Sequence, residues 1–379
     1  MISPKLLFET LTKNNVGFYA GVPDSLLKDV CAYFTDHVEM DNHIIAANEG
    51  AAVSLGIGYH LATNNLPLIY MQNSGLGNAI NPLVSLADPA VYSIPMILMI
   101  GWRGEPGRAD EPQHKKQGDI TLDMLEALDI SYSILSEQDE NAETISMLDN
   151  LCDSARKGNK PVALVVKSGA FSKYALKTKT NIEKKLLSRE QALAITLDFI
   201  PKKSILVATT GMLSRELFEL RKKSKEQHEK DFLTVGGMGH ASQIALGIAI
   251  QHKQKQVFCL DGDGSLIMHM GSLAINAASK ASNFHHLVFN NNVHDSVGGQ
   301  PTAAGSVNIC AAALSLGYSW CKLVSTDVDI KDAIKRIQEI DGPSLIEVRI
   351  KPGHRIDLGR PTIKPIKNKQ NFMDFLNYE

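Results

Sequence analysis

The chain of 379 residues has room for two or three domains. Apolar residues make up 44% and charged residues 21%, as in an average globular protein, which excludes a disordered chain or a coiled coil as the main state. The net charge of −2 leaves no basic excess to attract a polyanion, so nucleic acid is not an expected partner.

Short apolar runs that end in Gly, Asn, Asp or Ser predict strands buried on both faces. In chain order they cover residues 17–21, 66–71, 94–100, 161–166, 204–208, 256–260, 286–289 and 344–348. Stretches with helical spacing, such as 25–34 and 271–279, lie between them, and this alternation predicts parallel sheets covered by helices. Because the run 94–100 is far shorter than the ~20 residues of a membrane-spanning helix, we expect no membrane partner.

The strand–helix pattern runs twice along the chain. A Lys-rich stretch, residues 173–185, separates the two series, and we interpret it as a solvated linker rather than a nucleic-acid patch. Ser188 and Gln191 then form a capping-box pattern that starts a new helix. We therefore expect two doubly wound α/β domains, residues 1–180 and 181–379, with no domain between them.

Cysteine usage points to a reducing compartment. The five cysteines are scattered, form no C-x-x-C pair and are odd in number, which argues against a disulfide framework and against a thiolate metal site. Cys259 lies in an apolar run and is typical of a small core residue. The N-terminus has no long apolar signal core, so we expect a cytoplasmic protein.

The most informative segment is Gly-Asp-Gly-Ser at residues 262–265, directly after the predicted strand 256–260. Ligands of open α/β sheets bind at the carboxyl ends of strands, and glycines let the backbone approach an anion. The carboxylate of Asp263 could hold a hard cation that in turn binds phosphate oxygens. An ordinary Gly-Asp-Gly turn is the alternative.

A second polar segment supports the cation site. Asn291 follows the next predicted strand, 28 positions after Asp263, which fits one helix and one strand that returns beside the first. Both side chains would then lie at the same edge of the sheet, and amide oxygens suit Mg²⁺. An Asn-rich turn is the alternative.

Together the two segments resemble the cofactor signature of thiamin diphosphate-dependent enzymes of the pyruvate decarboxylase type. The resemblance implies that Asp263, Asn291 and the main-chain oxygen of Val293 bind Mg²⁺, which holds the diphosphate. Asn292 stands where relatives often have Gly; Asn tolerates the left-handed turn conformation, so this departure is mild.

Further segments match the family. Glu49, between Asn48 and Gly50, corresponds to the carboxylate beside the aminopyrimidine ring; a solvated Glu in the first turn of a helix is the alternative. Gly236 and Met238 correspond to the segment that holds the cofactor bent. The resemblance implies further cofactor contacts at Asn78, Thr210, Gly211, Gly262, Gly264 and Ser265.

The resemblance implies decarboxylation of a 2-oxo acid, because the thiazolium ring accepts the electrons left when CO₂ departs. Glu49 would favour the pyrimidine tautomer that generates the reactive carbanion. In this family the two halves of one site come from two chains, which implies a homodimer or a higher homo-oligomer with the site between chains.

Residues 294–302 and 21–25, with support from 110–114, resemble the phosphonopyruvate decarboxylases more specifically. This implies conversion of 3-phosphonopyruvate to phosphonoacetaldehyde and CO₂. Sulfopyruvate decarboxylases share much of the pattern and stay the alternative, as does a non-catalytic cofactor-binding subunit.

A small anionic 2-oxo acid with a second acidic group needs cationic donors. Arg103 follows the predicted strand 94–100, and its fork suits phosphonate oxygens; a surface ion pair is the alternative. His294, beside the metal ligands, is a candidate catalytic residue that carries a proton or binds the anion, unless it merely packs over the loop. Further substrate-binding candidates are Asp24, Ser25 and His114.

Overall fold

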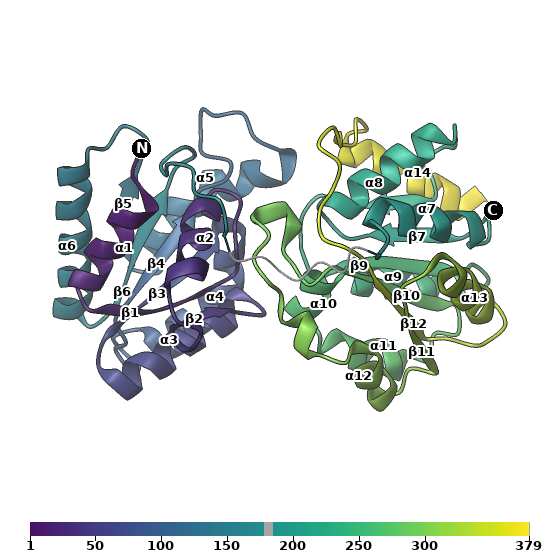
Figure 1. The fold of residues 1–379 in the computed structure, drawn as a ribbon, viewed down its shortest axis with the longest axis horizontal. Helices are drawn as coiled ribbons and strands as arrows, with labels where there is room; N and C mark the ends of the chain where they lie inside the picture. Colours follow the sequence, from purple (N-terminus) through teal and green to yellow (C-terminus); the bar gives the residue numbers. More distant parts are fainter. Residues whose placement is uncertain (178–184, 379) are drawn as a thin grey trace. The chain divides into compact units, whose positions relative to one another are not determined.

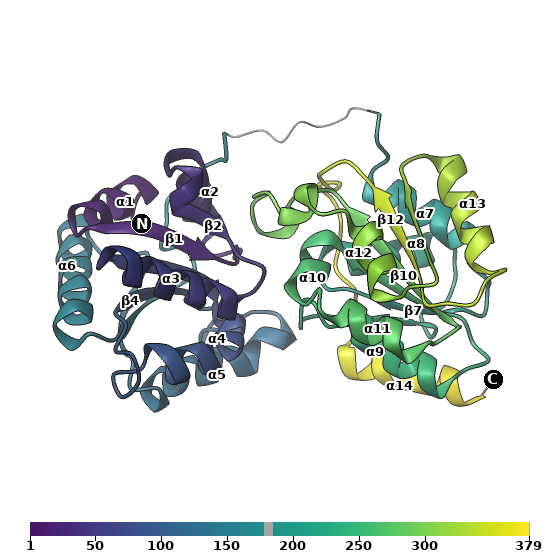
Figure 2. The same cartoon turned by 90° about the horizontal axis from the view of Figure 1, so that it is seen from below.

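The computed structural model describes residues 1–177 and 185–378 (Figures 1 and 2). The chain divides into two compact units, one made of Met1–Thr180 with Ser296–Pro301 and the other of Asn181–Asp295 with Thr302–Glu379. Much of the predicted linker, residues 178–184, lies outside the described residues.

The first unit is a six-stranded parallel sheet in the order β2-β1-β3-β4-β6-β5. Its strands are β1 Val16–Gly21, β2 His43–Ile45, β3 Leu66–Gln72, β4 Met96–Gly101, β5 Ser131–Leu135 and β6 Pro161–Val166. Its helices are α1 Pro4–Lys13, α2 Lys28–His37, α3 Glu49–Thr63, α4 Leu76–Pro82, α5 Pro112–Ala127 and α6 Asn141–Gly158. Helices α1, α2 and α6 contribute to one apolar cluster, and α3, α4 and α5 to a second.

The second unit repeats the plan with the order β11-β12-β10-β9-β7-β8. Its strands are β7 Ile205–Ala208, β8 Asp231–Leu233, β9 Val257–Gly262, β10 Phe284–Asn290, β11 Trp320–Val324 and β12 Ser344–Arg349. Its helices are α7 Arg189–Phe199, α8 Met212–Lys223, α9 Ala241–Gln251, α10 Asp263–Met268, α11 Ser272–Ser279, α12 Ile309–Leu316, α13 Asp327–Ile337 and α14 Pro365–Tyr378. Helices α7, α8 and α13 share one apolar cluster, and α9 to α12 with α14 share the other.

The predicted fold class, two doubly wound parallel-sheet domains, is confirmed, and each predicted strand is present. Four strands were not predicted from the sequence, namely β2, β5, β8 and β11. All four are edge strands, and because an edge strand is only partly covered it lacks the continuous apolar run that marks a central one. None of the described helices is long and apolar enough to cross a membrane.

The start of helix α2 differs from the prediction. The sequence pattern placed a helix from residue 25, whereas the structure begins it at Lys28. The reason is local: Asp24 Oδ2 accepts a hydrogen bond from the backbone N–H of Leu26 at 3.0 Å. This contact holds residues 24–26 as a turn, because a side-chain acceptor competes with helical hydrogen bonding.

Each sheet has a topological switch point, on either side of which the chain adds strands in opposite directions along the sheet. In the first unit β1 is flanked by β2 on one side and β3 on the other, so this point lies between β1 and β3. In the second unit the same argument places it between β7 and β9. Ligands of doubly wound sheets bind at these points, beyond the carboxyl ends of the strands.

Candidate active site

Glu49 opens helix α3, and its side chain is only 5% exposed. Asn78 donates its side-chain amide to Glu49 Oε2 at 2.8 Å. Gly75 lies against the same carboxylate, since a Cβ built there would be 2.2 Å from Glu49 Oε1. The structure therefore brings the predicted residues Glu49 and Asn78 together and excludes a solvated first-turn Glu.

Asp24 lies in the turn after β1 and is fully buried. Gln72, the last residue of β3, donates its amide to Asp24 Oδ1 at 2.6 Å. Burial raises the pKa of Asp24 above its ordinary value. A Cβ at Gly101 would lie 2.2 Å from Asp24 Oδ2, so only Gly leaves room for this carboxyl at the end of β4.

Arg103 follows β4 and is already paired. Its Nε donates to Asp110 Oδ2 at 2.8 Å, a second nitrogen donates to Asp110 Oδ1, and Nη1 donates to Ser25 Oγ at 2.8 Å. The hydrogen bond with Asp110 raises the pKa of Arg103, which stays a cation. The ion pair weighed as the alternative for Arg103 is thus present, and Arg103 also contacts Ser25, another of the substrate-binding candidates.

His114 is placed differently from the other substrate candidates. It lies half-buried in the first turn of α5, and its backbone oxygen packs against Gly104, where a Cβ would be 2.0 Å away. Its segment therefore contacts the loop that follows Arg103.

A single segment, residues 72–78, which runs from the end of β3 into the first turn of α4, connects these positions of the first unit. Gln72 holds Asp24, and Asn78 holds Glu49. Between them, Asn73 donates to the backbone oxygen of Arg103 at 2.8 Å and accepts from its N–H at 3.2 Å. The family resemblance pointed to Asn78 in this segment but not to Gln72, although the place of Gln72 directly after the predicted strand 66–71 was an available signal.

In the second unit, two loops meet the first turn of α10 at Ser265. Its Oγ lies 2.9 Å from Thr209 Oγ1 in the loop after β7 and accepts from the N–H of Gly239, before α9, at 3.0 Å. The predicted residues Thr210 and Gly211 belong to the loop after β7, Gly236 and Met238 to the loop before α9, and Gly262 to Ser265 to the junction of β9 with α10. Gly211 has φ +97, which favours glycine and gives its loop a tight entry into α8.

The predicted metal ligands lie at neighbouring strand ends. Asp263 is 3% exposed and Asn291 6%. Burial raises the pKa of Asp263 to about 6, although hydrogen bonds from Thr302 and from the backbone of Asp263, Asn291 and Gly264 oppose the shift. A buried carboxylate, an amide oxygen and a main-chain oxygen suit a hard divalent cation.

The turn between the ligands has the conformation expected for it. Asn292 has φ +61, in the left-handed region that Asn tolerates. Asn291 Oδ1 accepts from the N–H of Val293 at 3.1 Å, and Val293 is buried. The Asn at this position therefore replaces Gly without conflict.

His294 packs over the Gly-Asp-Gly turn. A Cβ at Gly264 would be 2.9 Å from His294 Cε1 and 3.4 Å from Cε of Met238. The side chains of His294 and Met238 therefore both lie against Gly264. Burial lowers the pKa of His294 to about 4, and the ring is neutral at pH 7. The alternative weighed for His294, packing over the loop, is therefore present. A role of His294 in proton transfer would start from its neutral imidazole.

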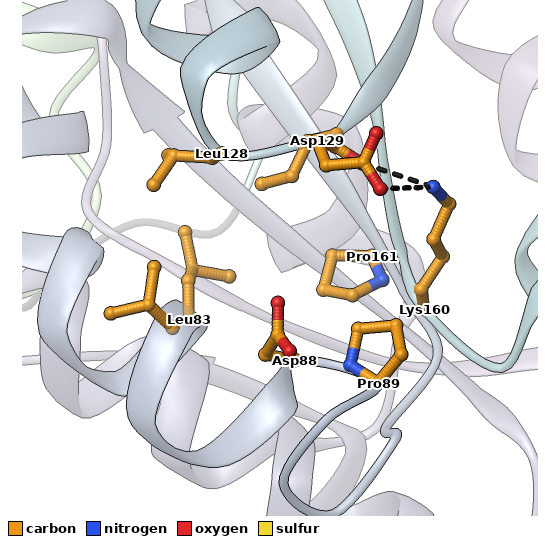
Figure 3. A pocket seen from close by; sticks show the side chains of 9 residues that line it. Leu83, Asp88, Pro89, Leu128, Asp129, Lys160 and Pro161 are labelled. Atoms are coloured by element: carbon orange, nitrogen blue, oxygen red, sulfur yellow. Dashed lines mark hydrogen bonds and ion pairs between the residues drawn. The ribbon is translucent and has the colours of Figure 1, made fainter.

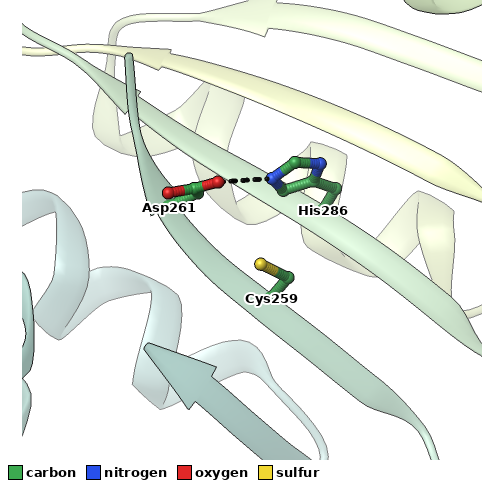
Figure 4. Close-up of side chains that lie close together, drawn as sticks. All are labelled: Cys259, Asp261 and His286. Atoms are coloured by element: carbon green, nitrogen blue, oxygen red, sulfur yellow. Dashed lines mark hydrogen bonds and ion pairs between the residues drawn. The ribbon is translucent and has the colours of Figure 1, made fainter. Parts of the chain in front are cut away.

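Cys259, Asp261 and His286 form a separate buried cluster on β9 and β10 (Figure 4). Their candidate ligand atoms lie within 4.8 Å of one another. His286 Nε2 is 3.2 Å from Asp261 Oδ2, and burial raises the pKa of the Cys259 thiol well above its usual value. A protonated thiol beside an Asp–His pair is a poor metal site, so we treat the cluster as part of the core.

A surface pocket in the first unit is lined by Leu83, Asp88 and Leu128, among others, and bordered by the ion pair of Lys160 with Asp129 at 3.1 Å (Figure 3). It includes residues just before β5 and at the start of β6, and therefore lies at the amino end of the sheet. Ligands of this fold bind at the opposite edge, so we do not assign the pocket to the active site.

Comparison with known proteins agrees with this geometry. The sequence matches the families described as "Thiamine pyrophosphate enzyme, N-terminal TPP binding domain" over residues 4–127 and "Thiamine pyrophosphate enzyme, C-terminal TPP binding domain" over residues 209–348. Phosphonopyruvate decarboxylases from Streptomyces viridochromogenes and Streptomyces hygroscopicus are each 33% identical to it, covering 99% of this chain and 95% and 94% of theirs. The chain belongs to the thiamine pyrophosphate-dependent decarboxylases.

A sulfopyruvate decarboxylase from Methanosarcina acetivorans is also similar, at 25% identity over 92% of this chain and 91% of that protein. The predicted family is confirmed, and the protein is a thiamine pyrophosphate-dependent 2-oxo acid decarboxylase. The roles of individual residues stay predictions, which the geometry above makes specific.

Proposed function

We propose that the protein decarboxylates 3-phosphonopyruvate to phosphonoacetaldehyde and CO₂, with thiamine pyrophosphate and Mg²⁺. The observation that supports this proposal most strongly is the similarity of nearly the whole chain to two phosphonopyruvate decarboxylases, at 33% identity. The sulfopyruvate decarboxylase, at 25%, is the less similar relative. We assign residues 1–180 to the pyrimidine-binding domain and 181–379 to the diphosphate-binding domain.

When bound, the cofactor supplies the electron sink that decarboxylation requires. Glu49 would hold a proton at its carboxylate beside the pyrimidine ring, in an orientation that Asn78 and Gly75 fix. Its burial supports this role, because a carboxylate shielded from water interacts more strongly with the group it faces.

Asp263, Asn291 and the Val293 backbone oxygen would hold Mg²⁺ and through it the diphosphate. The loops that meet at Ser265 would bind the rest of the cofactor, with backbone N–H groups near the phosphates and Met238 as the apolar support. The contacts proposed there involve Thr210, Gly211, Gly236, Gly262 and Gly264.

Arg103 and Ser25 would bind the phosphonate. The two side chains already contact each other, and the guanidinium is fixed by Asp110 on one side. Such a preoriented cation suits an oxyanion, because little side-chain freedom is lost on binding. Asp24 and His114 lie on the adjoining turn and helix, and His294 is the candidate for proton transfer during turnover.

We further infer a cytoplasmic homodimer or higher homo-oligomer. Five free cysteines fit a reducing compartment. Partly exposed apolar side chains on helices of the second unit, Ile275 at 58% and Leu314 at 48%, fit contact with another copy of the chain. Sedimentation of the purified protein would measure the assembly.

The test is a turnover assay that follows aldehyde and CO₂ from phosphonopyruvate and from sulfopyruvate, with and without the cofactor and Mg²⁺. We expect turnover of phosphonopyruvate only when both additions are present, with kcat/KM at least tenfold above that for sulfopyruvate. Preference for sulfopyruvate would contradict the proposed substrate.

A further inference from the structure

The side-chain amide of Asn291 is fixed at both ends. Its Nδ2 donates to Asp295 Oδ2 at 2.7 Å, while its Oδ1 accepts from the backbone N–H of Val293 at 3.1 Å. The residue is 6% exposed, so water has little part in this arrangement. The two contacts together define which end of the amide faces the predicted metal site.

The chemistry of Asp295 decides this orientation. The oxygen and nitrogen ends of an amide have nearly the same size, so only their hydrogen-bond partners distinguish them. A carboxylate accepts hydrogen bonds and does not donate them, and Asp295 must therefore face the NH₂ end of Asn291. An amide turned by 180° would present its NH₂ group toward the cation, which the cation would repel.

Asp295 is itself held by groups far away in the sequence. Arg189 Nη1 donates to its Oδ2 at 3.0 Å, and the N–H of Gly353 donates to Oδ1 at 3.0 Å. Arg189 is anchored by Glu216, with Nε to Oε2 at 2.8 Å and Nη2 to Oε1 at 3.1 Å. Arg189 and Glu216 are 7% and 1% exposed.

The contacts that hold Asp295 come from distant parts of the second unit and not only from its own turn. Arg189, the first residue of α7, and Gly353, in the loop after β12, both donate to the side chain that contacts Asn291, and Glu216 of α8 holds Arg189 in place. Burying charged groups costs free energy. One reason for a protein to keep such groups is that they fix the orientation of a neighbouring side chain.

We propose that Asp295 is a positioning residue of the metal site, which makes Asn291 present its oxygen rather than its NH₂ group to Mg²⁺. The proposal rests on the proposed function, because it takes Mg²⁺ at Asp263, Asn291 and Val293 as given. Loss of a residue that orients a metal ligand typically weakens metal binding about 10- to 100-fold.

The test is a double-mutant cycle on Asp295 and Asn291. Isothermal titration of Mg²⁺ into the full-length protein saturated with thiamine pyrophosphate gives the Kd, and the melting temperature of each variant without additions reports folding. Asp295→Ala is expected to raise the Kd about 10- to 100-fold. Asn291→Asp in that background is expected to restore it to within about fivefold of wild type, because both ends of a carboxylate are oxygen.

The same Asn291→Asp change in the wild-type background has the opposite expected effect. It would place two carboxylates in direct contact and so weaken Mg²⁺ binding. This reversal of sign separates an orienting role from a merely structural one, since a collapsed loop would not be rescued by a carboxylate. Asp198→Ala, an exposed change on α7, is the matched control and should leave the Kd unchanged.

Two results would overturn the proposal: a wild-type Kd in a folded Asp295→Ala variant, or an equal effect of Asn291→Asp in both backgrounds. If Asp295→Ala does not fold, the cycle is run with Asp295→Asn, where Asn291→Asp must strengthen binding while it weakens binding in wild type. A wild-type protein that takes up no Mg²⁺ would instead contradict the proposed function.

Discussion

Asn78 donates its side-chain amide to Glu49 Oε2 at 2.8 Å, and Gly75, just before α4, packs on the other carboxylate oxygen. The two contacts fix a buried acid at the start of α3 without a charged partner among these residues. The same segment, residues 72–78, also holds Asp24 through Gln72 and Arg103 through Asn73. One short segment therefore sets the positions of three proposed site residues.

Gly75→Ala is expected to displace the Glu49 carboxylate, because the new methyl group would lie 2.2 Å from Oε1 and 2.4 Å from Cδ. A misplacement of about 1 Å in a catalytic group costs roughly 100-fold in rate, so kcat should fall by about that factor. Gly77→Ala is the matched control. A Cβ there meets nothing within 4 Å, and in α4 it should add about 0.5–1 kcal/mol of stability. Equal kcat in both variants would contradict this account.

Glu49→Gln tests the acid itself. Gln keeps the size and can still contact Asn78, so the protein should fold and bind thiamine pyrophosphate with Mg²⁺ normally. Decarboxylation should fall by about 10²- to 10⁴-fold, the usual range for loss of an acid–base group. Cofactor binding is followed by circular dichroism and turnover by aldehyde release, with Glu39→Gln, an exposed change, as the control. Near-normal turnover would refute the assigned role.

The sequence predicted the central strands because each is a continuous apolar run between polar residues, as at 94–100 and 161–166. It also predicted that Asp263 and Asn291 would meet, because successive parallel strands carry their ends to one edge. Edge strands such as β11 escaped prediction, since only Val324 of Trp320–Val324 is fully buried and Lys322 interrupts the apolar run.

Partners that come from distant segments could not be predicted in the same way. The contact of Gln72 with Asp24 spans 48 positions and that of Arg189 with Asp295 spans 106. Neither pair has a spacing rule, because the contacts depend on which strand ends become neighbours after folding. The pairing of Arg103 with Asp110 could not be predicted from the sequence either. Asp110 lies seven positions from Arg103 and is one of several nearby acidic residues that could have formed the pair.

Arg103→Lys is expected to raise KM for phosphonopyruvate about tenfold with a smaller effect on kcat. A lysine ammonium cannot replace the fork that contacts Asp110 and Ser25 together. Arg108→Lys is the control, because Arg108 forms its ion pairs with Glu105 and Glu137 on the surface at 45% exposure. Steady-state kinetics measure both variants. An unchanged KM in Arg103→Lys would remove Arg103 from the substrate site.

Asp263→Ala is expected to abolish Mg²⁺-dependent retention of thiamine pyrophosphate, measured by gel filtration followed by cofactor quantification. The protein itself should still fold, because burial raises the pKa of Asp263, which means that its charged form lowers the stability of the metal-free protein. Asp341→Ala, an exposed change in the same unit, is the control. A variant that retains the cofactor in the presence of Mg²⁺ would contradict the proposed ligand set.

Acidification should destabilise both units between pH 6.5 and 4, because each holds a neutral histidine that is shielded from water, half-buried His43 in the first unit and buried His285 in the second. Burial lowers the pKa of His43, which contacts Tyr70 Oη at 2.9 Å, and of His285, which contacts Ser344 Oγ at 2.8 Å, to about 4 in each case.

The unfolded chain binds protons at these two histidines near pH 6.5 and the folded chain only near pH 4. The contribution of the neutral histidines to the free energy of unfolding is therefore fully present above pH 6.5 and is lost as the pH falls. By pH 5 each histidine should cost about 2 kcal/mol of unfolding free energy. Urea denaturation at pH 7.5, 6 and 5 measures this, and His285→Gln should reduce the pH dependence of the second unit without removing it, because burial also lowers the pKa of His294 to about 4. A slope that His285→Gln leaves unchanged would show that other groups govern the acid sensitivity.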